Sequence, residues 1–430
     1  MVKIAIAGYG IEGEQSVKYW LSRGDDVVVV DEQETLSRAV PDGVPTRLGP
    51  HVLDDLSEFD LVVRTAGLAP HKISSAKRIW SATNEFFARC PAPIIGVTGT
   101  KGKGTTCSLI TAILRAAGHT VHLVGNIGQP ALETLPDIAE QDIVVYELSS
   151  FQLWDLEKSP HIAVVLMIEP DHLDVHASME EYVQAKATIV RYQNRDDVVI
   201  YYADNHWSEE IAAQAISNKI RYGTAEDQGV YVKSSNFFVQ DQLVCPVDCL
   251  TIAGNFNREN ACAAITASLT VDRSVAPFVA EGLRSFHGLP HRLKYVATRG
   301  GVDYYDNSIA TTPGSAVAAL NSFEGKRIII LGGSDKGADY APVIEACLNA
   351  GARVIAIGQT GDKIATLCEQ AGVAVVRIEG GMREVVAAAR SVADSGSTVI
   401  LSPASASFDQ YKSYADRGDQ FIEAVLQLEQ

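Results

Sequence analysis

The chain of 430 residues is long enough for about three domains, each able to bury its own core. Its 47% hydrophobic and 21% charged residues are typical of a folded globular protein and exclude a disordered or collagen-like chain. Lysine and arginine number 36 against 53 aspartates and glutamates, and the resulting net charge of −17 disfavours binding to nucleic acid or to an anionic membrane surface.

The first predicted unit, in chain order, alternates strands and a helix around a glycine-rich turn. A helix is predicted over 15–22, and strands are predicted at 2–7, 27–30 and 61–64. The turn Gly8-x-Gly10-x-x-Gly13 allows a diphosphate to approach a helix N-terminus, and Asp31 ends the second strand, where its carboxylate can accept from a ribose or uridine. This pattern fits a dinucleotide cofactor, a nucleotide-diphosphate substrate, or a glycine turn that only packs helix on strand.

A second glycine-rich loop follows a strand predicted at 94–98. The loop reads Gly99-Thr100-Lys101-Gly102-Lys103-Gly104-Thr105-Thr106 and leads into an apolar-periodic helix. This order of strand, loop and helix is typical of a P-loop, whose N–H groups surround ATP phosphates. Lys103 would neutralise the β- and γ-phosphates, and Thr105 or Thr106 would ligate Mg²⁺. The first glycine of the common pattern is absent, because Val97 stands at that place.

Further candidate ligands follow the next predicted strands, at 121–124, 143–147 and 163–167. Glu147 ends a buried strand, so its carboxylate faces the edge where parallel sheets bind ligands, and a metal-ligand role is natural there. Asp171, His172, Asp174 and His176 also fit a zinc site, although one histidine near Mg²⁺ suits this sheet better. Lys186 lies on the next predicted helix, and periodicity alone favours an ordinary surface lysine.

The remaining segments predict a turn-rich antiparallel part and a third α/β series. Antiparallel strands are predicted over 230–251 and helices over 257–270 and 275–286; the strands that follow are at 302–306, 328–331, 354–357, 375–377 and 399–401. The predicted fold class is α/β with three domains, each with a mainly parallel sheet. These are a Rossmann-like N-terminal domain (1–91), a P-loop ATPase-like central domain (92–292) and a Rossmann-like C-terminal domain (293–430).

The cysteines and the apolar segments of the sequence indicate the cellular compartment of the protein. The seven cysteines are scattered without a C-x-x-C pair, and Cys245 with Cys249 lacks the second pair that a zinc site needs. This favours reduced thiols in a cytoplasmic protein. The N-terminal apolar run is too short for a signal peptide, and no apolar stretch predicts a membrane-spanning helix.

The combination of motifs resembles the Mur ligases, the ATP-dependent amide-forming enzymes of peptidoglycan precursor synthesis, over nearly the whole chain. The matching segments are 99–106, 125–128, 147–153, 171–172, Lys186, Asn257 with Asn260, 289–292 and 401–410. The runs Glu-Leu-Ser-Ser-Phe-Gln and Ser-Pro-Ala are those that point to a glutamate-adding member of the family.

The resemblance implies a role for each domain and for single residues. The N-terminal domain would bind UDP, the central domain ATP, and the C-terminal domain the amino acid. Implied ATP contacts are residues 99–106, Asn257, Asn260 and Arg292. Catalytic roles fall to Lys103, His172 and Lys186, and two Mg²⁺ ions would be held by Thr105 or Thr106, Glu147, His172 and a carbamylated Lys186. The UDP-linked substrate would contact Gly10, Ile11, Glu12, Asp31, Gly67, Asn126, Ser149 and Gln152. Glutamate would contact Thr311, Lys336, Ser407 and Tyr414.

The implied reaction adds glutamate, expected to be D-glutamate, to UDP-N-acetylmuramoyl-L-alanine through an acyl phosphate, in a cytoplasmic monomer. Two departures bear on this: Gly104 follows Lys103 as in folylpolyglutamate synthases, and Ile309 stands where some glutamate-adding relatives have lysine. Another Mur-type or folylpolyglutamate synthase-like ligase is the alternative within the family. Two other classes of function are alternatives. A nicotinamide-dependent oxidoreductase would give no role to residues 99–106 and 401–410. A nucleotide sensor would bind ATP without acceptor-dependent phosphate release.

Overall fold

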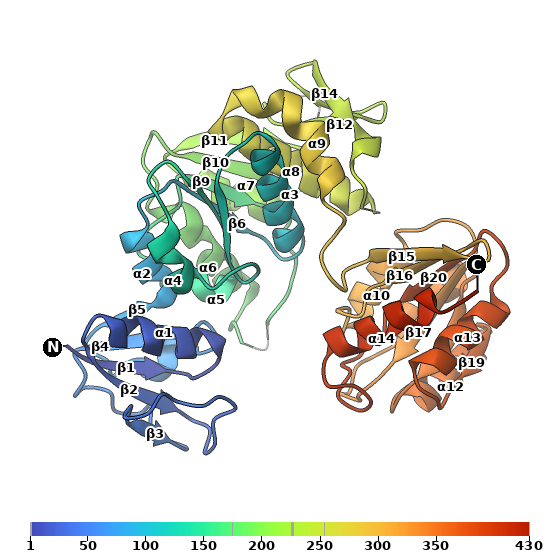
Figure 1. Cartoon of the computed structure of the whole chain (residues 1–430), viewed down its shortest axis with the longest axis horizontal. Helices are drawn as coiled ribbons and strands as arrows, with labels where there is room; N and C mark the ends of the chain where they lie inside the picture. Colours follow the sequence, from blue (N-terminus) through green and yellow to red (C-terminus); the bar gives the residue numbers. More distant parts are fainter. Residues whose placement is uncertain (1, 174, 225–227, 253, 430) are drawn as a thin grey trace. The chain divides into compact units, whose positions relative to one another are not determined.

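A computed structural model describes residues 2–173, 175–224, 228–252 and 254–429. The chain forms two compact units, the first made of Met1–Cys249 and Arg258–Ser285, and the second of Leu250–Asn257 and Phe286–Gln430 (Figure 1). Both contain mainly parallel sheets between helices, so the predicted α/β class is confirmed. The first unit includes the predicted N-terminal domain and most of the predicted central domain, whereas residues 250–257 and 286–292 of the latter belong to the second unit. The boundary near residue 91 stays a prediction.

The N-terminal sheet is parallel, with the strand order β3-β2-β1-β4-β5. Its elements are β1 (Lys3–Ala7), α1 (Ile11–Ser22), β2 (Asp26–Asp31), β3 (Thr46–Leu48), β4 (Leu61–Arg64), a 3-10 helix (Pro70–Ile73), β5 (Ile79–Ser81) and α2 (Ala82–Arg89). Ile4 and Ile6 join one core cluster, and Ala5 and Ala7 join the cluster on the opposite face, because successive side chains of a strand alternate. Both faces are therefore buried, which fits the continuous apolar runs of this sheet.

The central sheet is also parallel, with the order β11-β10-β9-β6-β8-β7. Its strands are β6 (Ile94–Thr98), β7 (Val121–Gly125), β8 (Ile143–Glu147), β9 (Ile162–Val165), β10 (Val198–Tyr202) and β11 (Asn218–Tyr222). The helices between them are α3 (Lys103–Ala116), α4 (Ala131–Thr134, followed by a 3-10 turn at Leu135–Asp137), α5 (Ser150–Leu153), α6 (Met179–Arg191) and α7 (His206–Ala213). Since β6 lies between β8 and β9, the loops that follow these three strands meet at one edge of the sheet.

The antiparallel segment is confirmed. Strands β12 (Tyr231–Lys233), β13 (Asn236–Val239) and β14 (Gln242–Pro246) pair in order, before a 3-10 turn at Val247–Cys249 and α8 (Asn255–Val271). The single helix predicted over 275–286 is wrong: a 3-10 helix (Arg273–Phe278) precedes α9 (Val279–Ser285). Pro277 lies inside the 3-10 part and lacks the N–H that a regular helical ladder needs.

The second unit has a six-stranded sheet in the order β15-β16-β20-β17-β18-β19, in which only the β15–β16 pair is antiparallel. Its strands are β15 (Lys294–Arg299), β16 (Val302–Asp306), β17 (Arg327–Gly332), β18 (Arg353–Ile357), β19 (Val375–Arg377) and β20 (Thr398–Leu401). Its helices are α10 (Pro313–Leu320), α11 (Ala341–Asn349), α12 (Gly361–Ala371), α13 (Met382–Val392) and α14 (Tyr414–Leu426).

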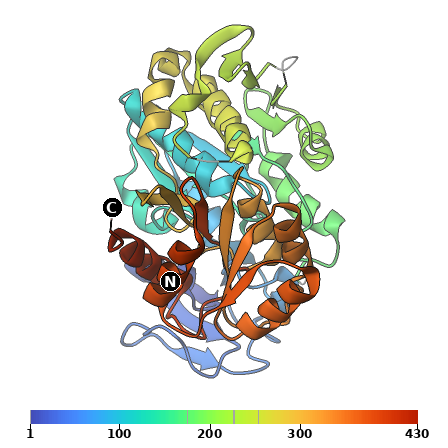
Figure 2. The same ribbon diagram turned by 90° about the vertical axis from the view of Figure 1, so that its right-hand side faces the viewer.

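Alternation along these strands separates two cores. Ile329 and Leu331 of β17 pack with α10, α11 and α12, whereas Ile328 and Ile330 pack with α13 and α14. Figure 2 shows the strands of this unit between helices on either side. Loops lie at the carboxyl ends of the strands.

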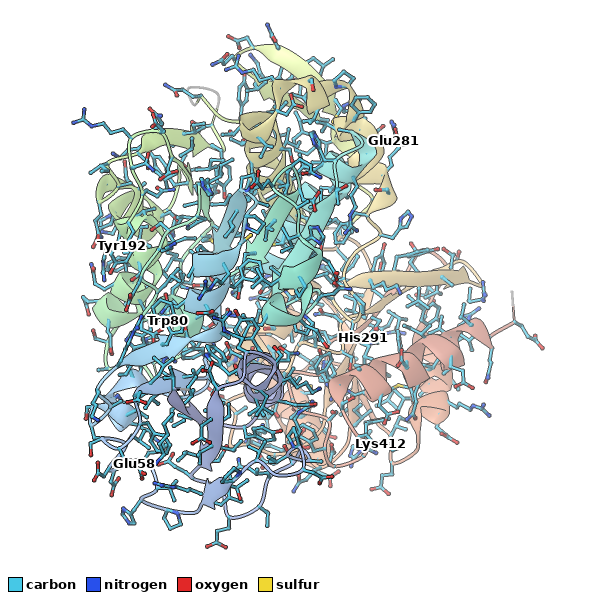
Figure 3. All side chains as sticks on the ribbon, turned by 60° about the vertical axis from the view of Figure 1, so that its left-hand side comes forward. Glu58, Trp80, Tyr192, Glu281, His291 and Lys412 are labelled. Carbon is cyan, nitrogen blue, oxygen red and sulfur yellow. The ribbon has the colours of Figure 1, made fainter. Side chains whose placement is uncertain are left out.

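The N-terminal and central sheets share one hydrophobic cluster within the first unit. Phe86 of α2 packs edge-on against Tyr146 of β8, with ring centroids 5.3 Å apart. Trp80 of β5, labelled in Figure 3, packs against the same cluster and donates from Nε1 to Glu85 at 2.9 Å. Among the described residues, no helix has the length and apolar character needed to cross a membrane.

Candidate functional site

The loop after β6 is tightly enclosed by its neighbours. Gly99 and Gly102 have φ of +153° and +84°, which favour glycine. A Cβ on Gly99 would lie 2.7 Å from Cβ of Leu166, and one on Gly102 would lie 2.2 Å from Oδ1 of Asn260. The predicted ATP residue Asn260 of α8 is therefore brought directly against this loop.

Two lysines converge on the same carbonyl of the loop. Lys103, the first residue of α3, donates from Nζ to the carbonyls of Gly99 and Thr100, at 3.0 Å each. Lys186 of α6 donates from Nζ to the Gly99 carbonyl at 2.9 Å. The charge of Lys103 at the mouth of a glycine-rich loop suits a polyphosphate anion. Lys101, in contrast, is exposed and 3.1 Å from Glu169.

Lys186 is buried, and the surface position favoured by its periodicity is wrong. Its side chain is 1% exposed, and Nζ lies 4.5 Å from the ring centre of Tyr182. Burial lowers the pKa of Lys186 well below its usual value, and the nearby charge of Lys103 acts in the same direction. No carboxylate is close enough to form an ion pair with Lys186 among the described residues, so the neutral amine is favoured.

Glu147 lies at the same edge as this loop. Val97 of β6 pairs in register with Glu147 of β8, and the buried Thr105 and Thr106 lie in the first turn of α3. After its own burial, the charge of Glu147 is the main influence that raises the pKa of Cys107 on α3, so the carboxylate and this turn are neighbours. Within the described part of the chain, Oγ1 of Thr106 is buried without a hydrogen-bond partner.

The two histidines that follow β9 have different environments. His172 is exposed, with φ of +53°, its ring 5.0 Å from that of Phe151 and Nε2 3.6 Å from Asp171. His176 is buried, stacked on Phe151 and tilted against Trp154. Asp174 lies outside the described residues, and among those described no group of three or more His, Cys, Asp or Glu is arranged to hold a metal. The structure therefore gives no support to the zinc alternative, and it leaves His172 accessible.

Two other predicted ATP residues belong to the second unit. Asn257 is buried at the start of α8, and Arg292 is exposed just before β15. Their approach to the loop after β6 stays a prediction.

The predicted UDP contacts gather at the carboxyl edge of the N-terminal sheet. Gly8 has φ of +90°, and Gly10 and the exposed Ile11 follow it at the start of α1. The carboxylate of Asp31 accepts from the backbone N–H groups of Tyr9 at 2.7 Å and of Gln33 at 2.9 Å. Asp31 thus braces the glycine turn, which is a role that the sequence does not reveal.

The loop after β4 completes this edge. Glu12 accepts from the backbone N–H of Ala66 at 2.7 Å, and burial raises the pKa of Glu12. Gly67 is exposed, and a Cβ placed there would meet nothing within 4 Å. The structure therefore brings Glu12 and the loop that contains Gly67 together beside the glycine turn.

Three predicted substrate contacts lie beside Glu147. The backbone N–H of Asn126 donates to the Glu147 carbonyl at 3.3 Å. Ser149 and Gln152 form a capping box at α5: Ser149 accepts from the backbone of Gln152 at 3.3 Å, and the Gln152 side chain accepts from the backbone of Ser149 at 2.9 Å. Their observed bonds fix the start of α5, and any contact with substrate stays a prediction.

The predicted glutamate contacts occupy the loops after β16, β17 and β20 in the second unit. Lys336 is exposed, with Nζ 5.9 Å from the ring centre of Phe408, and Thr311 is also exposed. Ser407 is 2% exposed, and its Oγ is buried without a hydrogen-bond partner in the described chain. Tyr414 begins α14 and is partly exposed. A buried hydroxyl beside accessible donors suits a polar ligand.

Sequence reasoning missed a buried guanidinium below these loops. Arg417 of α14 is fully buried and donates to Ser308 and to the Ser405 carbonyl at 2.8–3.1 Å. Its partners are uncharged, and burial lowers the pKa of Arg417 to about 10. Its sequence signal is one arginine on an amphipathic helix, which gives no reason to expect burial.

A buried histidine–carboxylate pair lies close by in the same unit. Nδ1 of His291, labelled in Figure 3, is 2.7 Å from Asp306 at the end of β16. Burial raises the pKa of Asp306, against the opposing hydrogen bonds from Ser308 and His291. This pair ties the segment before β15 to the carboxyl edge of the sheet.

Family models match most of the chain. The model for the Mur ligase middle domain matches residues 97–268, and the model for the Mur ligase glutamate ligase domain matches residues 291–405. These matches cover the loop after β6 and the carboxyl edge of the second unit.

Full-length relatives and solved structures agree with these matches. The UDP-N-acetylmuramoylalanine--D-glutamate ligase of Symbiobacterium thermophilum is 37% identical, over 99% of this chain and 98% of its own length. The enzyme of that name from Acetivibrio thermocellus is 36% identical, over 99% and 97%. The fold is similar to that of UDP-N-acetylmuramate-alanine ligase MurC from Thermotoga maritima, with a TM-score of 0.62, 18% identity and coverage of 99% of both chains. MurF ligase from Thermotoga maritima, solved with ADP, gives 0.59 at 16% identity over 98% of this chain and 93% of its own. The chain belongs to the Mur ligase family.

Proposed function

We propose that this chain is an ATP-dependent ligase that joins D-glutamate to UDP-N-acetylmuramoyl-L-alanine in peptidoglycan precursor synthesis. The convergence of Lys103 and Lys186 on the Gly99 carbonyl is the observation that carries the proposal. It places the Lys103 cation and the buried Lys186 amine together beside a helix N-terminus, where a transferring phosphoryl group is held. The names of the full-length relatives support the choice of substrates.

The loop of residues 99–106 would hold ATP. Its N–H groups and Lys103 would bind the phosphates, with Lys103 exchanging its present bonds to loop carbonyls for phosphate oxygens. Asn260 would fix the position of the loop through its contact with Gly102. Asn257 and Arg292 are the other proposed contacts of ATP.

The donors around the loop fit Mg²⁺, which prefers oxygen ligands. The buried Oγ1 of Thr106, without a partner in the described chain, favours Thr106 over Thr105 as a ligand, and Glu147 is its neighbour at the sheet edge. His172 and Lys186 would hold a second ion. Two bound ions would offset the repulsion between ATP and the substrate carboxylate.

Lys186 would act as a carbamate. A neutral amine can attack carbon dioxide, forming an N–C bond and releasing one proton to water, and the product is an anionic oxygen ligand. Burial of Lys186 favours the neutral amine that this addition needs. The same change would place an anion beside the positive charge of Lys103, which attracts it.

The reacting groups would be brought together by three sets of residues. The edge that contains Gly10, Ile11, Glu12, Asp31 and Gly67 would hold the UDP part, and Asn126, Ser149 and Gln152 would contact the muropeptide. The substrate carboxylate attacks the γ-phosphate of ATP, and ADP leaves. Glutamate, held by Thr311, Lys336, Ser407 and Tyr414, attacks the acyl phosphate through its amine, so that an amide forms and phosphate is released. The chain's contribution is positioning and electrostatic stabilisation.

The proposal includes a monomer located in the cytoplasm. All seven cysteines are free in the structure, which suits a reducing compartment.

Phosphate release would test the function, with ATP, UDP-N-acetylmuramoyl-L-alanine and a panel of D- and L-amino acids. We expect release that depends on both the UDP substrate and D-glutamate. Release with another amino acid would assign a different Mur-type reaction. Release only with a folate acceptor would assign a folylpolyglutamate synthase-like reaction, and ATP binding without acceptor-dependent release would refute a ligase.

A further inference from the structure

Arg64, the last residue of β4, is fully buried between two segments that are far apart in the sequence. Its guanidinium forms a two-point ion pair with the carboxylate of Asp155, with Nε to Oδ2 at 2.7 Å and Nη2 to Oδ1 at 2.8 Å. Nη2 also donates to the carbonyl of Phe151 in α5, at 2.7 Å. This planar two-point geometry fixes the orientation of both partners.

The remaining donors of Arg64 hold the loop that follows it. Nη1 donates to the carbonyls of Thr65 at 3.2 Å, Ala66 at 3.4 Å and Leu68 at 2.7 Å. On the other side of the loop, Glu12 accepts from the backbone N–H of Ala66. The backbone of residues 65–68 is therefore fixed by a cation through its carbonyls and by a carboxylate through one N–H.

The other face of this loop is free. Gly67 is exposed, and a Cβ placed on it would meet nothing within 4 Å. A loop that is fixed from below and open above presents its backbone to a ligand at defined positions, which lowers the ordering cost of binding.

Asp155 belongs to the central part of the same unit, and α2 of the N-terminal part binds it a second time. Its backbone carbonyl accepts from Nδ2 of Asn84 at 2.9 Å, and it follows α5, which begins three residues after Glu147. The contacts of Arg64 therefore connect the loop containing Gly67 with the segment that runs from Glu147 through Ser149 and Gln152.

We propose that Arg64 and Asp155 are positioning residues that set the loop 65–68 at the correct distance from the segment 147–153, so that one UDP-linked substrate can contact both. This inference rests on the proposed function, because those two segments contain the proposed contacts for the UDP part and for the reacting end of that substrate. Stability alone does not explain the Arg64–Asp155 pair, because apolar side chains of similar volume often stabilise a buried site equally well. Its geometric specificity accounts for its presence.

The test compares Arg64→Lys, Arg64→Leu and Asp155→Asn with a matched control, Arg327→Leu. Arg327 also donates to backbone carbonyls, those of Phe323 at 2.9 Å and Ala350 at 3.0 Å, but it lies in the second unit and pairs with no carboxylate of the described residues. Arg64→Lys keeps the charge and loses the planar fork, so it is the variant most certain to fold. Wild-type ligation with UDP-N-acetylmuramoyl-L-alanine is measured first, and its absence would refute the proposed function rather than this inference.

For Arg64→Lys and Asp155→Asn we expect the KM for the UDP-linked substrate to rise at least about tenfold, with the KM for ATP changed less than about twofold. Calorimetric binding of UDP-N-acetylmuramoyl-L-alanine without ATP should weaken by the same factor. In Arg327→Leu we expect a lower melting temperature with both KM values unchanged. An unchanged KM for the UDP-linked substrate in a folded Arg64→Lys protein, or an equal rise in both KM values, would overturn the inference.

Hydrogen exchange of the peptide that contains residues 65–68 gives a readout that does not depend on substrate. Exchange should accelerate at least about tenfold in Arg64→Leu and remain unchanged in Arg327→Leu. Equal protection of this peptide in wild type and Arg64→Leu would show that the arginine does not fix the loop.

Discussion

Replacing Gly102 by alanine should damage the nucleotide loop in two separable ways. With φ of +84°, an alanine at this position adopts a left-handed backbone, which costs about 1–2 kcal/mol. Its Cβ would also lie 2.2 Å from Oδ1 of Asn260, so the amide must leave its position, and an off-rotamer side chain costs about 0.5–1.5 kcal/mol. The sum is about 1.5–3.5 kcal/mol of folding free energy.

Gly118, at the other end of α3, provides a matched control. It has φ of +89°, and a Cβ placed there would meet nothing within 4 Å. Gly118→Ala should therefore show the backbone cost alone. The difference between the two variants isolates the contact with Asn260, and it corresponds to roughly 1–6 °C in melting temperature.

Thermal melts and phosphate-release kinetics with varied ATP would measure both effects. Because a displacement of about 1 Å can cost 10²-fold in rate, we expect kcat/KM for ATP to fall by about that factor in Gly102→Ala and by less than about twofold in Gly118→Ala. Equal melting temperatures and equal ATP kinetics in the two variants would refute the reasoning, since the Asn260 contact would then have no influence on the loop.

Four further predictions concern the lysines. Lys103→Ala should all but abolish phosphate release while circular dichroism stays unchanged, because a charge-assisted contact to the transferring phosphate is lost; near-normal release would contradict the assignment. Lys186→Arg should be inactive, because a guanidinium cannot become a carbamate. Burial holds the pKa of Lys186 in the folded chain well below 10.5, its value in the unfolded chain. At a pH between the folded and the unfolded pKa, the unfolded chain binds more protons than the folded one, so stability rises with pH. Denaturant unfolding at stepped pH should show this slope weakened in Lys186→Met by up to about 1.4 kcal/mol per pH unit, and identical slopes would contradict a buried neutral amine. Lys336→Met should weaken glutamate use at least about tenfold with little change for ATP, and steady-state kinetics that show an equal loss for both would remove Lys336 from the site.

The central strand and its loop are predictable because their signals are local. An apolar run followed by glycines and lysines specifies β6, the turn and α3, and the boundaries Ile94–Thr98 agree with the sequence prediction. Strand β15 was missed, since Lys294–Arg299 is partly charged and is defined only by its antiparallel partner β16. Sheet order is likewise a matter of contacts between distant segments, which one sequence does not display.

Side-chain roles were less predictable than side-chain positions. Asp31 lies at the predicted strand end, yet its carboxylate binds backbone N–H groups of its own turn, because a short acidic side chain finds such donors first. Arg64 has an ordinary sequence context, and only the fold brings Asp155 to it across about 90 residues. Periodicity placed Lys186 at the surface, since it does not show that both faces of α6 are covered near that residue.

The order of strands in the second unit has a consequence for synthesis of the protein. Strand β20 comes last in sequence but lies between β16 and β17, so the inner edges of both remain unpaired until the ribosome has passed residue 401 of 430. At about 5–20 residues per second, the roughly 90 residues between β16 and β20 take about 5–20 s to appear. During this interval the inner edge of β16, and then that of the apolar strand β17, is unpaired, an arrangement that recruits other nascent chains. A transcript truncated before the codon for Thr398 would make that exposure permanent.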